Sequence, residues 1–388
     1  MRGLGQALAA LGVGLRSAVV RPRHALLALA GFFIATSVLI ALLAIPRAIR
    51  HMVTVTGSKR IVLLLPRLGS YAGGNLLPAR DAAIAADLPG VAQTTPQLVV
   101  TEELRQANGS KTEVLIRGVT ASTFALTQPA LRLVQGHRFS QGSNGVIVGR
   151  GAARIFPQLV LGGQVRIAKT LWRVSGYFAA GGGLWGSEIW APLSTLQSAV
   201  NAAGMVSVVW VNLISTSDYA RFKRAVEADP RLAVHLVRQR DYYRRQMNFL
   251  VHFASIAVWG IAGLLGLVAL AATLNAVGLG LIARSGELAV LRAIGFTRTS
   301  LAVAIITEVL FTGLIGVGLA AFLTLLALQH TTFVTRSAGY AIVVPLSVNS
   351  ELIVTAVCYA LVLGLVSALG PALHAVCRPL APELRHGG

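Results

Sequence analysis

The chain has 388 residues, of which 55% are hydrophobic and only 12% are charged. So little charge cannot cover the surface of a soluble protein of this length, and the mean hydropathy of +0.69 indicates that much of the chain lies in lipid. Composition therefore excludes a purely cytosolic globular enzyme and a disordered chain. The formal net charge is +20, from 34 Lys and Arg against 14 Asp and Glu, and in a soluble protein it would suggest nucleic acid.

Four uncharged runs are long enough to cross a bilayer, which takes about 20 apolar residues in a helix. The first, Ala25 to Ile45, follows a basic flank and can be interpreted as a signal peptide, but no small-residue cleavage site follows it, so we expect an anchor. We expect a cytoplasmic N-terminal segment (1–24), transmembrane helices (25–46, 246–283, 299–329, 352–376), an extracytoplasmic domain with a stalk (47–245), a cytoplasmic coupling helix (284–298), an extracytoplasmic loop (330–351) and a cytoplasmic tail (377–388).

The basic residues of the short loops set the orientation. Arg284, Arg292 and Arg298 lie between the second and third runs, whereas the loop between the third and fourth runs holds only Arg336. Because Lys and Arg concentrate in cytoplasmic loops, the first of these loops, the tail and the N-terminus are predicted to be cytoplasmic. The large domain between the first two runs is then extracytoplasmic.

The positive charge belongs mainly to that large domain. Between Pro46 and Arg245 the chain has 24 Lys and Arg against 10 Asp and Glu, a net charge of +14, so we expect no nucleic-acid partner. Two interpretations stay open: a general use of Arg beside an anionic lipid surface, or contact with an acidic lipid, glycolipid or peptide cargo.

The large domain is predicted to be of the α+β class. Asn108-Gly109 between two apolar-rich runs predicts a β-hairpin of Leu98–Arg105 with Lys111–Val119. Further strands are expected at 60–65, 145–148, 164–167, 172–177, 188–192 and 207–214, and helices at 79–87, 191–203 and 217–228. The glycine-rich segment 181–186 is predicted to be a flexible loop, in which Trp185 and the nearby Trp190 look exposed and can contact a partner or lipid.

No motif for catalysis is present in the sequence. It has no G-x-x-x-x-G-K-[ST], no G-x-S-x-G and no H-E-x-x-H, so ATP, if used, must bind another subunit. Glu102 and Glu103 point to opposite faces of a strand, and Cys358 and Cys377 are too far apart on one helix to pair. We therefore expect no enzyme, no catalytic residue, no metal site and no cofactor in this chain.

The most informative segment lies between the second and third runs. Leu288, Leu291 and Ile294 recur at helical spacing, and Gly295 is well placed to end the helix. An amphipathic helix of this kind either lies along the membrane surface or binds a partner, and its own residues leave both open.

This segment closely resembles the FtsX-like permease motif of the MacB family of ABC transporters, R-x-x-E-(I/L)-(G/A)-x-L-(R/K)-A-(L/I)-G. The matching residues are Arg284, Glu287, Leu288, Ala289, Leu291, Arg292, Ala293, Ile294 and Gly295. The resemblance continues into Gly370-Pro371-Ala372 and departs at Arg378-Pro379, where the family often has Asp-Pro. The large domain is similar to the MacB-type periplasmic core at 136–139, 146–149, 153–157, 162–167 and 174–176.

The resemblance implies a type VII, mechanotransmitting permease subunit of a bacterial inner membrane, with four transmembrane helices and a MacB-type core between helices 1 and 2. It implies an ABC ATPase partner that holds ATP and Mg, a second permease copy or paralogue in a dimer, contact with membrane lipids and, in some relatives, a periplasmic adaptor. The expected function is export or extraction of a lipid, lipoprotein, glycolipid, peptide or drug. The alternatives are an FtsX-like regulator of a cell-wall hydrolase and a non-transporting sensor or scaffold.

Residue roles follow as hypotheses. Glu287 and Arg292 can form salt bridges with the ATPase, while Leu288, Leu291 and Ile294 can fill a groove in it. Glu308, in the third span, either makes a structural hydrogen bond or relays the coupling movement.

The start of the second run has an aromatic pair with two interpretations. Tyr242 and Tyr243 belong either to a stalk or to an aromatic belt at the membrane surface.

Overall fold

The computed structural model describes residues 22–67, 74–127, 130–283, 285–329, 331–337, 340–346 and 348–377. The predicted coupling residue Arg284, most of the N-terminal segment and the tail beyond Cys377 lie outside the described residues. The chain divides into two compact units. The helical unit contains the described residues up to Pro46, those of Phe253–Thr331 and those from Leu346 on, and the outer unit contains those of Arg47–His252 and Thr332–Pro345.

Within the described residues, the helices that belong wholly or partly to the helical unit are α2 (Pro22–Thr56), α8 (Gln239–Ala283), α9 (Ser285–Ala293), α10 (Arg298–Leu328) and α11 (Ser350–Cys377). Among the described residues, four of them are long and apolar enough to cross a membrane, at Leu26–Thr56, Gln239–Gly280, Arg298–Leu328 and Ser350–Gly370. The predicted fold class is confirmed. Both α2 and α8 extend beyond the spans assigned to them, since α2 continues past residue 46 and α8 begins before residue 246.

Small residues bring the membrane helices close together. Phe32 of α2 is 1% exposed and packs on α10 at Gly313 and Gly316, where an added Cβ would lie 3.4 Å and 3.0 Å from its atoms. In α11, the Tyr359 hydroxyl donates a 2.6 Å hydrogen bond to the carbonyl oxygen of Ala262 in α8. Backbones can approach in this way because glycine has no side chain, which is the usual packing of helices in lipid.

The outer unit is a mixed sheet with short helices. Its helices are α3 (Asp81–Ala86), α4 (Ala121–Thr127), α5 (Arg150–Ile155), α6 (Leu193–Ala199) and α7 (Tyr219–Ala228), with the short turns η1 (Leu184–Ser187) and η2 (Thr216–Asp218). Its strands are β1 (Ile61–Pro66), β2 (Leu77–Pro78), β3 (Val91–Arg105), β4 (Lys111–Val119), β5 (Arg132–Gly136), β6 (Gly145–Gly149), β7 (Gln164–Ile167), β8 (Thr170–Ala179), β9 (Ile189–Pro192), β10 (Met205–Val206), β11 (Val208–Leu213), β12 (Val234–Arg238), β13 (Thr332–Ser337) and β14 (Tyr340–Pro345).

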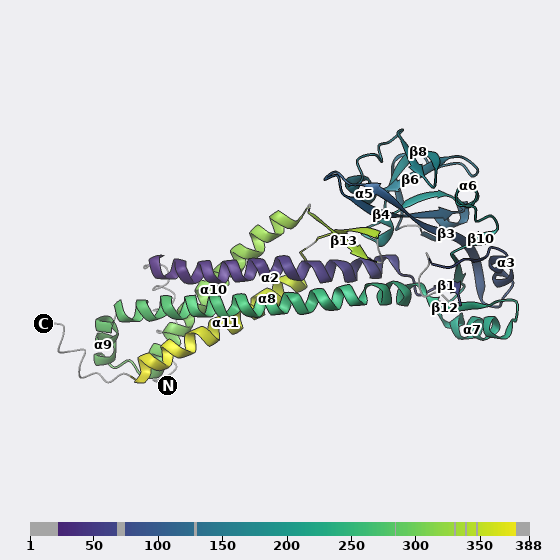
Figure 1. Ribbon diagram of the computed structural model, residues 1–388. Helices are drawn as coiled ribbons and strands as arrows, with labels where there is room; N and C mark the ends of the chain where they lie inside the picture. The colour runs from purple at the N-terminus through teal and green to yellow at the C-terminus, as the bar shows by residue number, and fades with distance from the viewer. Residues whose placement is uncertain are drawn as a thin grey trace. The chain divides into compact units, whose positions relative to one another are not determined.

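One long strand joins the two halves of this sheet. The main strand order is β12-β1-β11-β3-β4-β9-β6-β8-β5, with β14 beside β4 and β7 beside β8. The first half of β3 pairs with β11 and the second half pairs with β4. Figure 1 shows β1, β12 and α7 at one end of the unit and β6, β8 and α5 at the other.

Every strand and helix predicted for this unit overlaps an observed one. The hairpin at Asn108-Gly109 is confirmed, and Gly109 has the positive φ of +82° that its turn requires. The interpretation of Trp185 and Trp190 as exposed is wrong, because they are 3% and 0% exposed and their rings pack against each other. The glycine-rich segment leads into η1, whose tryptophan belongs to the core.

Candidate functional site at the outer ends of the helices

Two membrane helices lead directly into neighbouring strands of the outer sheet. Only four residues separate the end of α2 at Thr56 from β1, and none separates β12 from α8. β1 and β12 are antiparallel neighbours, with Val62 opposite Arg238. Figure 1 shows these two strands side by side. Both helices therefore lead into the same end of the strand order, at β12 and β1.

The two helix ends are also fastened to each other. The Ser58 backbone N–H donates a 2.9 Å hydrogen bond to Oε1 of Gln239, which is 0% exposed. The Arg240 N–H donates to the Ser58 carbonyl at 3.3 Å. A Cβ on Gly57 would lie 2.7 Å from the Arg240 Cα, so the close approach requires glycine there.

The end of α2 has a second attachment, to the turn η1. The Leu184 N–H donates a 2.7 Å hydrogen bond to Oγ1 of Thr56, and that bond is buried. The glycine-rich segment 181–186 thus holds a helix end, a role that its composition did not reveal.

A hairpin connects the other two membrane helices to the same sheet. The strands β13 and β14 lie between α10 and α11 in the chain, within the segment predicted only as an extracytoplasmic loop. β14 pairs with β4 at Tyr340 and Glu113, and the Val343 N–H donates a buried 2.9 Å hydrogen bond to Oγ of Ser187. Gln246 of α8 also donates to the Tyr340 hydroxyl at 3.3 Å.

A buried ion pair lies at the centre of this sheet. Arg117 of β4 donates through Nε and Nη2 to the two carboxylate oxygens of Glu188, each at 2.7 Å, and both side chains are 4% exposed. Trp190 Nε1 donates to Glu188 at 2.8 Å, and Arg117 Nη1 donates to Gln97 Oε1 at 3.0 Å. These bonds join β3 and β4 to the residues at the start of β9.

The Arg117 guanidinium stays charged although it is buried. Burial disfavours the charged guanidinium, but the charge of Glu188 and its hydrogen bonds raise the pKa of Arg117 further above its ordinary value. The Arg117 guanidinium also lies 5.6 Å from the centroid of the Trp210 ring. A bidentate pair of this kind fixes strand geometry more than it adds stability.

Two tyrosines of α8 pack beside this pair. Tyr242 and Tyr243 are 8% and 5% exposed, and Trp185 Nε1 donates to the Tyr243 hydroxyl at 3.4 Å. Both line a small hollow together with Arg117 and Tyr340. Buried rings cannot form an aromatic belt in lipid, so the stalk interpretation is the one that fits.

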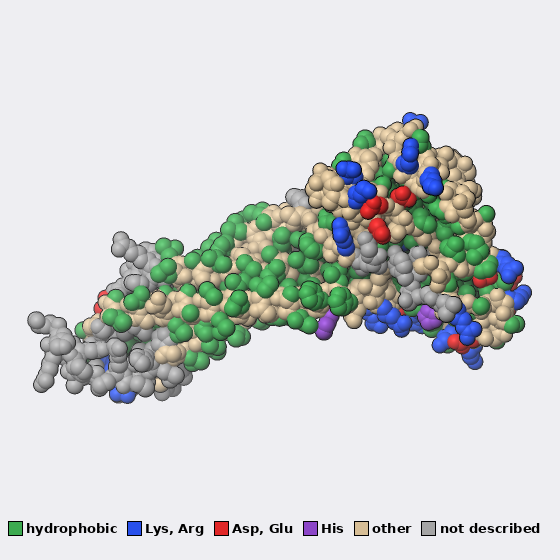
Figure 2. Space-filling view, viewed as in Figure 1, with side chains coloured by type: hydrophobic (Ala, Val, Ile, Leu, Met, Phe, Trp, Pro, Cys, Tyr) green, Lys and Arg blue, Asp and Glu red, His purple; other side chains and the backbone are tan. Residues whose placement is uncertain are grey.

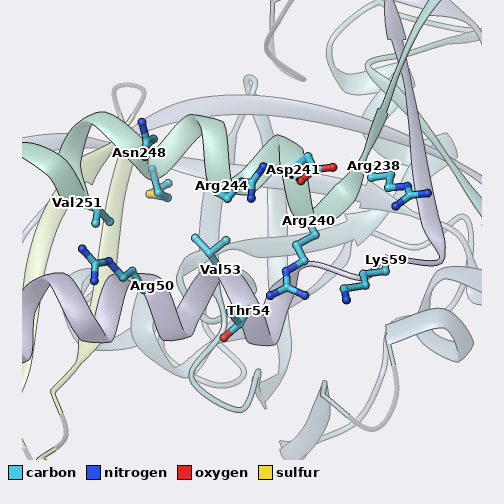
Figure 3. Close-up of a pocket in the computed structure, with 11 residues that line it drawn as sticks. Arg50, Val53, Thr54, Lys59, Arg238, Arg240, Asp241, Arg244, Asn248 and Val251 are labelled. Carbon is cyan, nitrogen blue, oxygen red and sulfur yellow. Dashed lines mark ion pairs between the residues drawn. The ribbon is translucent and has the colours of Figure 1, made fainter. Parts of the chain in front are cut away.

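A basic cavity of about 580 Å³ lies beside the helix ends (Figure 3). Its ionisable lining residues are Arg50, Lys59, Arg238, Arg240, Asp241 and Arg244. Asp241 pairs with Arg244 at 3.2 Å, and five cations against one carboxylate leave the cavity strongly positive. Figure 2 shows Lys and Arg side chains gathered on the outer unit and a largely apolar surface on the helices.

The predicted coupling segment belongs to the helical unit and forms a helix of its own. α9 covers Ser285–Ala293, and the Gly295 N–H donates to the Arg292 carbonyl at 3.1 Å with φ of +105° at Gly295. Glycine thus ends the helix as predicted. Glu287 and Ala293 are exposed, Ile294 is 73% exposed and Arg292 is half-buried.

Three of the predicted coupling side chains cannot be placed. Arg284 and the side chains of Leu288 and Leu291 lie outside the described part of the chain, so the groove-filling role of the two leucines stays a prediction.

Glu308 is half-buried in α10. Its carbonyl oxygen accepts a 2.8 Å hydrogen bond from Thr312. Both of its predicted roles, structural hydrogen bond and relay, stay predictions. It belongs to the helical unit, like α9, whereas the ion pair and the basic cavity belong to the outer unit.

Comparison with protein families identifies both parts of the chain. The model of the MacB-like periplasmic core domain matches residues 25–229, and that of the FtsX-like permease C-terminal domain matches residues 259–379. The chain belongs to the MacB/FtsX-like permeases of type VII ABC transporters. Permeases of this family are subunits of ABC transporters in which the ATPase is a partner. The chain is therefore a membrane protein with an extracytoplasmic domain.

Three solved structures are similar to part of the chain. The periplasmic region of MacB from Actinobacillus actinomycetemcomitans is 17% identical, with a TM-score of 0.38, and the match covers 50% of this chain and 95% of that one. The extracellular domain of the noncanonic ABC-type transporter YknZ from Gram-positive bacteria is 18% identical, with a TM-score of 0.33, covering 42% and 87%. A permease domain from Porphyromonas gingivalis is 19% identical, with a TM-score of 0.30, covering 46% and 88%. No curated protein matches the chain.

Sequence reasoning missed the ion pair and the cavity. Arg117 interrupts an otherwise apolar run of strand residues, and a lone charge in such a run is a signal of a buried pair. Glu188 stands just before the apolar run of β9 and gave a weaker signal. The cavity had no comparable signal, because Arg50 and Arg240 are 190 positions apart in the chain.

Proposed function

We propose that this chain transmits movement from a cytoplasmic ATPase to its outer unit, and that the moving outer unit exports or extracts an amphiphilic cargo at the outer face of a bacterial inner membrane. ATP and Mg bind in the partner ATPase, and this chain holds no cofactor. Two permease chains, identical or paralogous, form the working dimer, and a periplasmic adaptor can extend the path.

The continuity of helix and strand carries the proposal. All four membrane helices are joined to one sheet, α2 and α8 through the adjacent strands β1 and β12, and α10 and α11 through the β13–β14 hairpin. Movement of the helices then becomes movement of the sheet without a channel through the lipid. The hydrogen bond from the Ser58 backbone N–H to Gln239 Oε1 opposes sliding of the two helix ends past each other.

The ATPase contact is assigned to α9 and the residues just after it. Ile294 exposes 73% of its surface, and Glu287 and Ala293 of the same segment are exposed as well. An exposed apolar side chain suits a groove of a partner protein. A helix ended by Gly295 and followed closely by α10 can pass displacement into that span.

The test compares two identical substitutions at two exposed isoleucines. Ile294→Asp alters the proposed contact, whereas Ile214→Asp alters a residue of the outer unit that is 63% exposed. Tagged full-length protein is purified in mild detergent, and the ABC ATPase that accompanies it is quantified by mass spectrometry. Ile294→Asp should recover on the order of tenfold less ATPase, since a central interface residue contributes about 2 kcal/mol or more. Ile214→Asp should recover as much as the wild type.

Two results would contradict the proposal. If the wild type retains no ATPase while a control permease keeps its own, the chain acts as a sensor or scaffold. If both variants recover equal amounts, the coupling contact is not at Ile294.

A further inference from the structure

The basic cavity combines cationic groups from separate elements of the outer unit. Arg50 comes from α2, Lys59 from the segment before β1, Arg238 from β12, and Arg240 and Arg244 from α8. In Figure 3, Arg50 and Arg240 extend from different helices into the space between α2 and α8. Cations brought together in this way repel one another, so the arrangement is stabilised when an anion binds.

Among the described residues, Arg238 has a buried N–H donor without a hydrogen-bond acceptor. Nε of Arg238 is buried and lacks a hydrogen-bond partner among the described residues, and the guanidinium lies 4.2 Å from the Tyr219 ring centroid. A buried donor without an acceptor is costly. Several guanidinium groups around one space match a phosphate better than a carboxylate, because phosphate offers more oxygens.

The cavity is larger than a free phosphate requires, and it has an apolar wall. About 580 Å³ lies within the range of sites for small organic ligands. Val53, Met247 and Val251 supply the wall, and Val251 lies at the beginning of the uncharged run of α8. Arg50 follows the uncharged run of α2 by five residues, or about 7.5 Å along a helix. Both positions correspond to the depth of lipid headgroups at the outer face.

We propose that this cavity binds the phosphate-bearing headgroup of an anionic amphiphile. The guanidinium groups bind the phosphate oxygens, and the apolar wall lies beside the first carbons of the lipid. Naming this ligand as the cargo rests on the function proposed above, whereas the binding itself does not.

The test is native mass spectrometry of the full-length protein together with its co-purified ATPase. The complex is titrated with phosphatidylglycerol, with phosphatidylcholine and with inorganic phosphate. Arg50→Gln with Arg240→Gln removes two cavity cations. Arg221→Gln with Arg224→Gln removes two exposed cations from α7 and gives the same net charge. The cavity variant should bind phosphatidylglycerol about 25-fold more weakly, because each of the two removed cations contributes about fivefold near a phosphate. The α7 variant should match the wild type.

Several results would overturn the proposal. Equal weakening in both variants would mean that net charge alone attracts the lipid. Unchanged binding in the cavity variant, or equal affinity for phosphatidylcholine, would exclude an anionic headgroup site. Full displacement of the lipid by inorganic phosphate at equal concentration would assign the site to the free anion. Loss of the dimer with lipid binding intact would assign the cavity to contact between copies. The ATPase band in the same spectra shows separately whether the transport assignment holds.

Discussion

The contacts that stabilise the interior of the outer unit differ from those that stabilise the interior of the helical unit. In the outer unit, tryptophans 0–3% exposed surround a buried ion pair with four hydrogen bonds, and strands are paired along their length. In the helical unit, Phe32 packs against glycines, and the Tyr359–Ala262 bond joins α11 to α8. The first arrangement is rigid because every member fixes its neighbours. The helical arrangement relies on contacts of apolar side chains with glycine, which are not directional and allow helices to shift.

This difference in packing suggests different roles for the two units in the proposed function. Polar bonds that fix one geometry suit a unit that moves as a whole, as in the outer unit. Small residues and few directional bonds suit helices that change their packing, as in the helical unit. In the function proposed above, the outer unit is the part that is displaced, and the helices are the parts that rearrange.

The largest effect is expected at the buried ion pair. Arg117→Met leaves Glu188 charged and buried, which should cost about 3–5 kcal/mol of unfolding free energy. Thermal unfolding of the full-length protein, followed by tryptophan fluorescence, measures it, since Trp172, Trp185, Trp190 and Trp210 all lie in the outer unit. The double variant Arg117→Met with Glu188→Leu should recover most of the loss.

An exposed pair supplies the control for this prediction. Lys111 and Glu103 are 3.1 Å apart, but their side chains are 60% and 57% exposed. Lys111→Met should therefore cost only about 0.2–1 kcal/mol. Equal losses from Arg117→Met and Lys111→Met would mean that the outer unit does not depend on its buried pair.

The next effect is expected where α2 meets α10. A Cβ at Gly316 would lie 3.0 Å from the Phe32 Cβ, so Gly316→Leu should cost about 1–3 kcal/mol through overpacking. At Gly318 no atom lies within 4 Å of an added Cβ, and Gly318→Leu should leave stability unchanged or slightly raised. Helix content followed by circular dichroism on heating in detergent compares the two. Equal behaviour of the variants would refute close packing at Gly316.

The smallest effect is expected at the Tyr359 hydroxyl. Tyr359→Phe removes its 2.6 Å hydrogen bond to Ala262, and such bonds between membrane helices contribute only about 0.6 kcal/mol on average. The same heating measurement should show a small shift. A loss comparable to that of Arg117→Met would remove the contrast between the units, because directional bonds would then hold both.

Much of this fold follows from local sequence patterns. The membrane helices follow from uncharged runs, the β3–β4 hairpin from Asn108-Gly109, and the end of α9 from Gly295, since each depends on residues close in the chain. The family resemblance predicted a coupling segment at 284–298, and α9 is a helix there, while its coupling role stays a prediction.

The features missed depend on contacts between distant residues. Whether Trp185 faces solvent is decided by Trp190, Trp210 and Tyr243, and nothing near it in the sequence indicates burial. The β13–β14 hairpin was missed because a short loop between membrane spans gives little sign that it will join a sheet. The site at the helix ends can therefore be identified only when the pairing of the strands is known.

The central claim is that β12 and α8 act as one continuous element that drives the outer unit. Four residues, Gly-Ser-Gly-Ser, inserted between Arg238 and Gln239 would interrupt it, and the same insertion between Asn108 and Gly109 is the control in an exposed turn. Spin labels at Lys223→Cys and Gln329→Cys, in a Cys358→Ser and Cys377→Ser background, report the distance between the units in the complex with its ATPase.

Double electron–electron resonance measures the distance between the two spin labels in the nucleotide-free complex and in the vanadate-trapped complex. The uninterrupted chain and the hairpin insertion should show the same nucleotide-dependent change in distance. The insertion before Gln239 should reduce that change while ATP hydrolysis continues. An unchanged distance shift with the insertion before Gln239 would contradict mechanical transmission through β12 and α8.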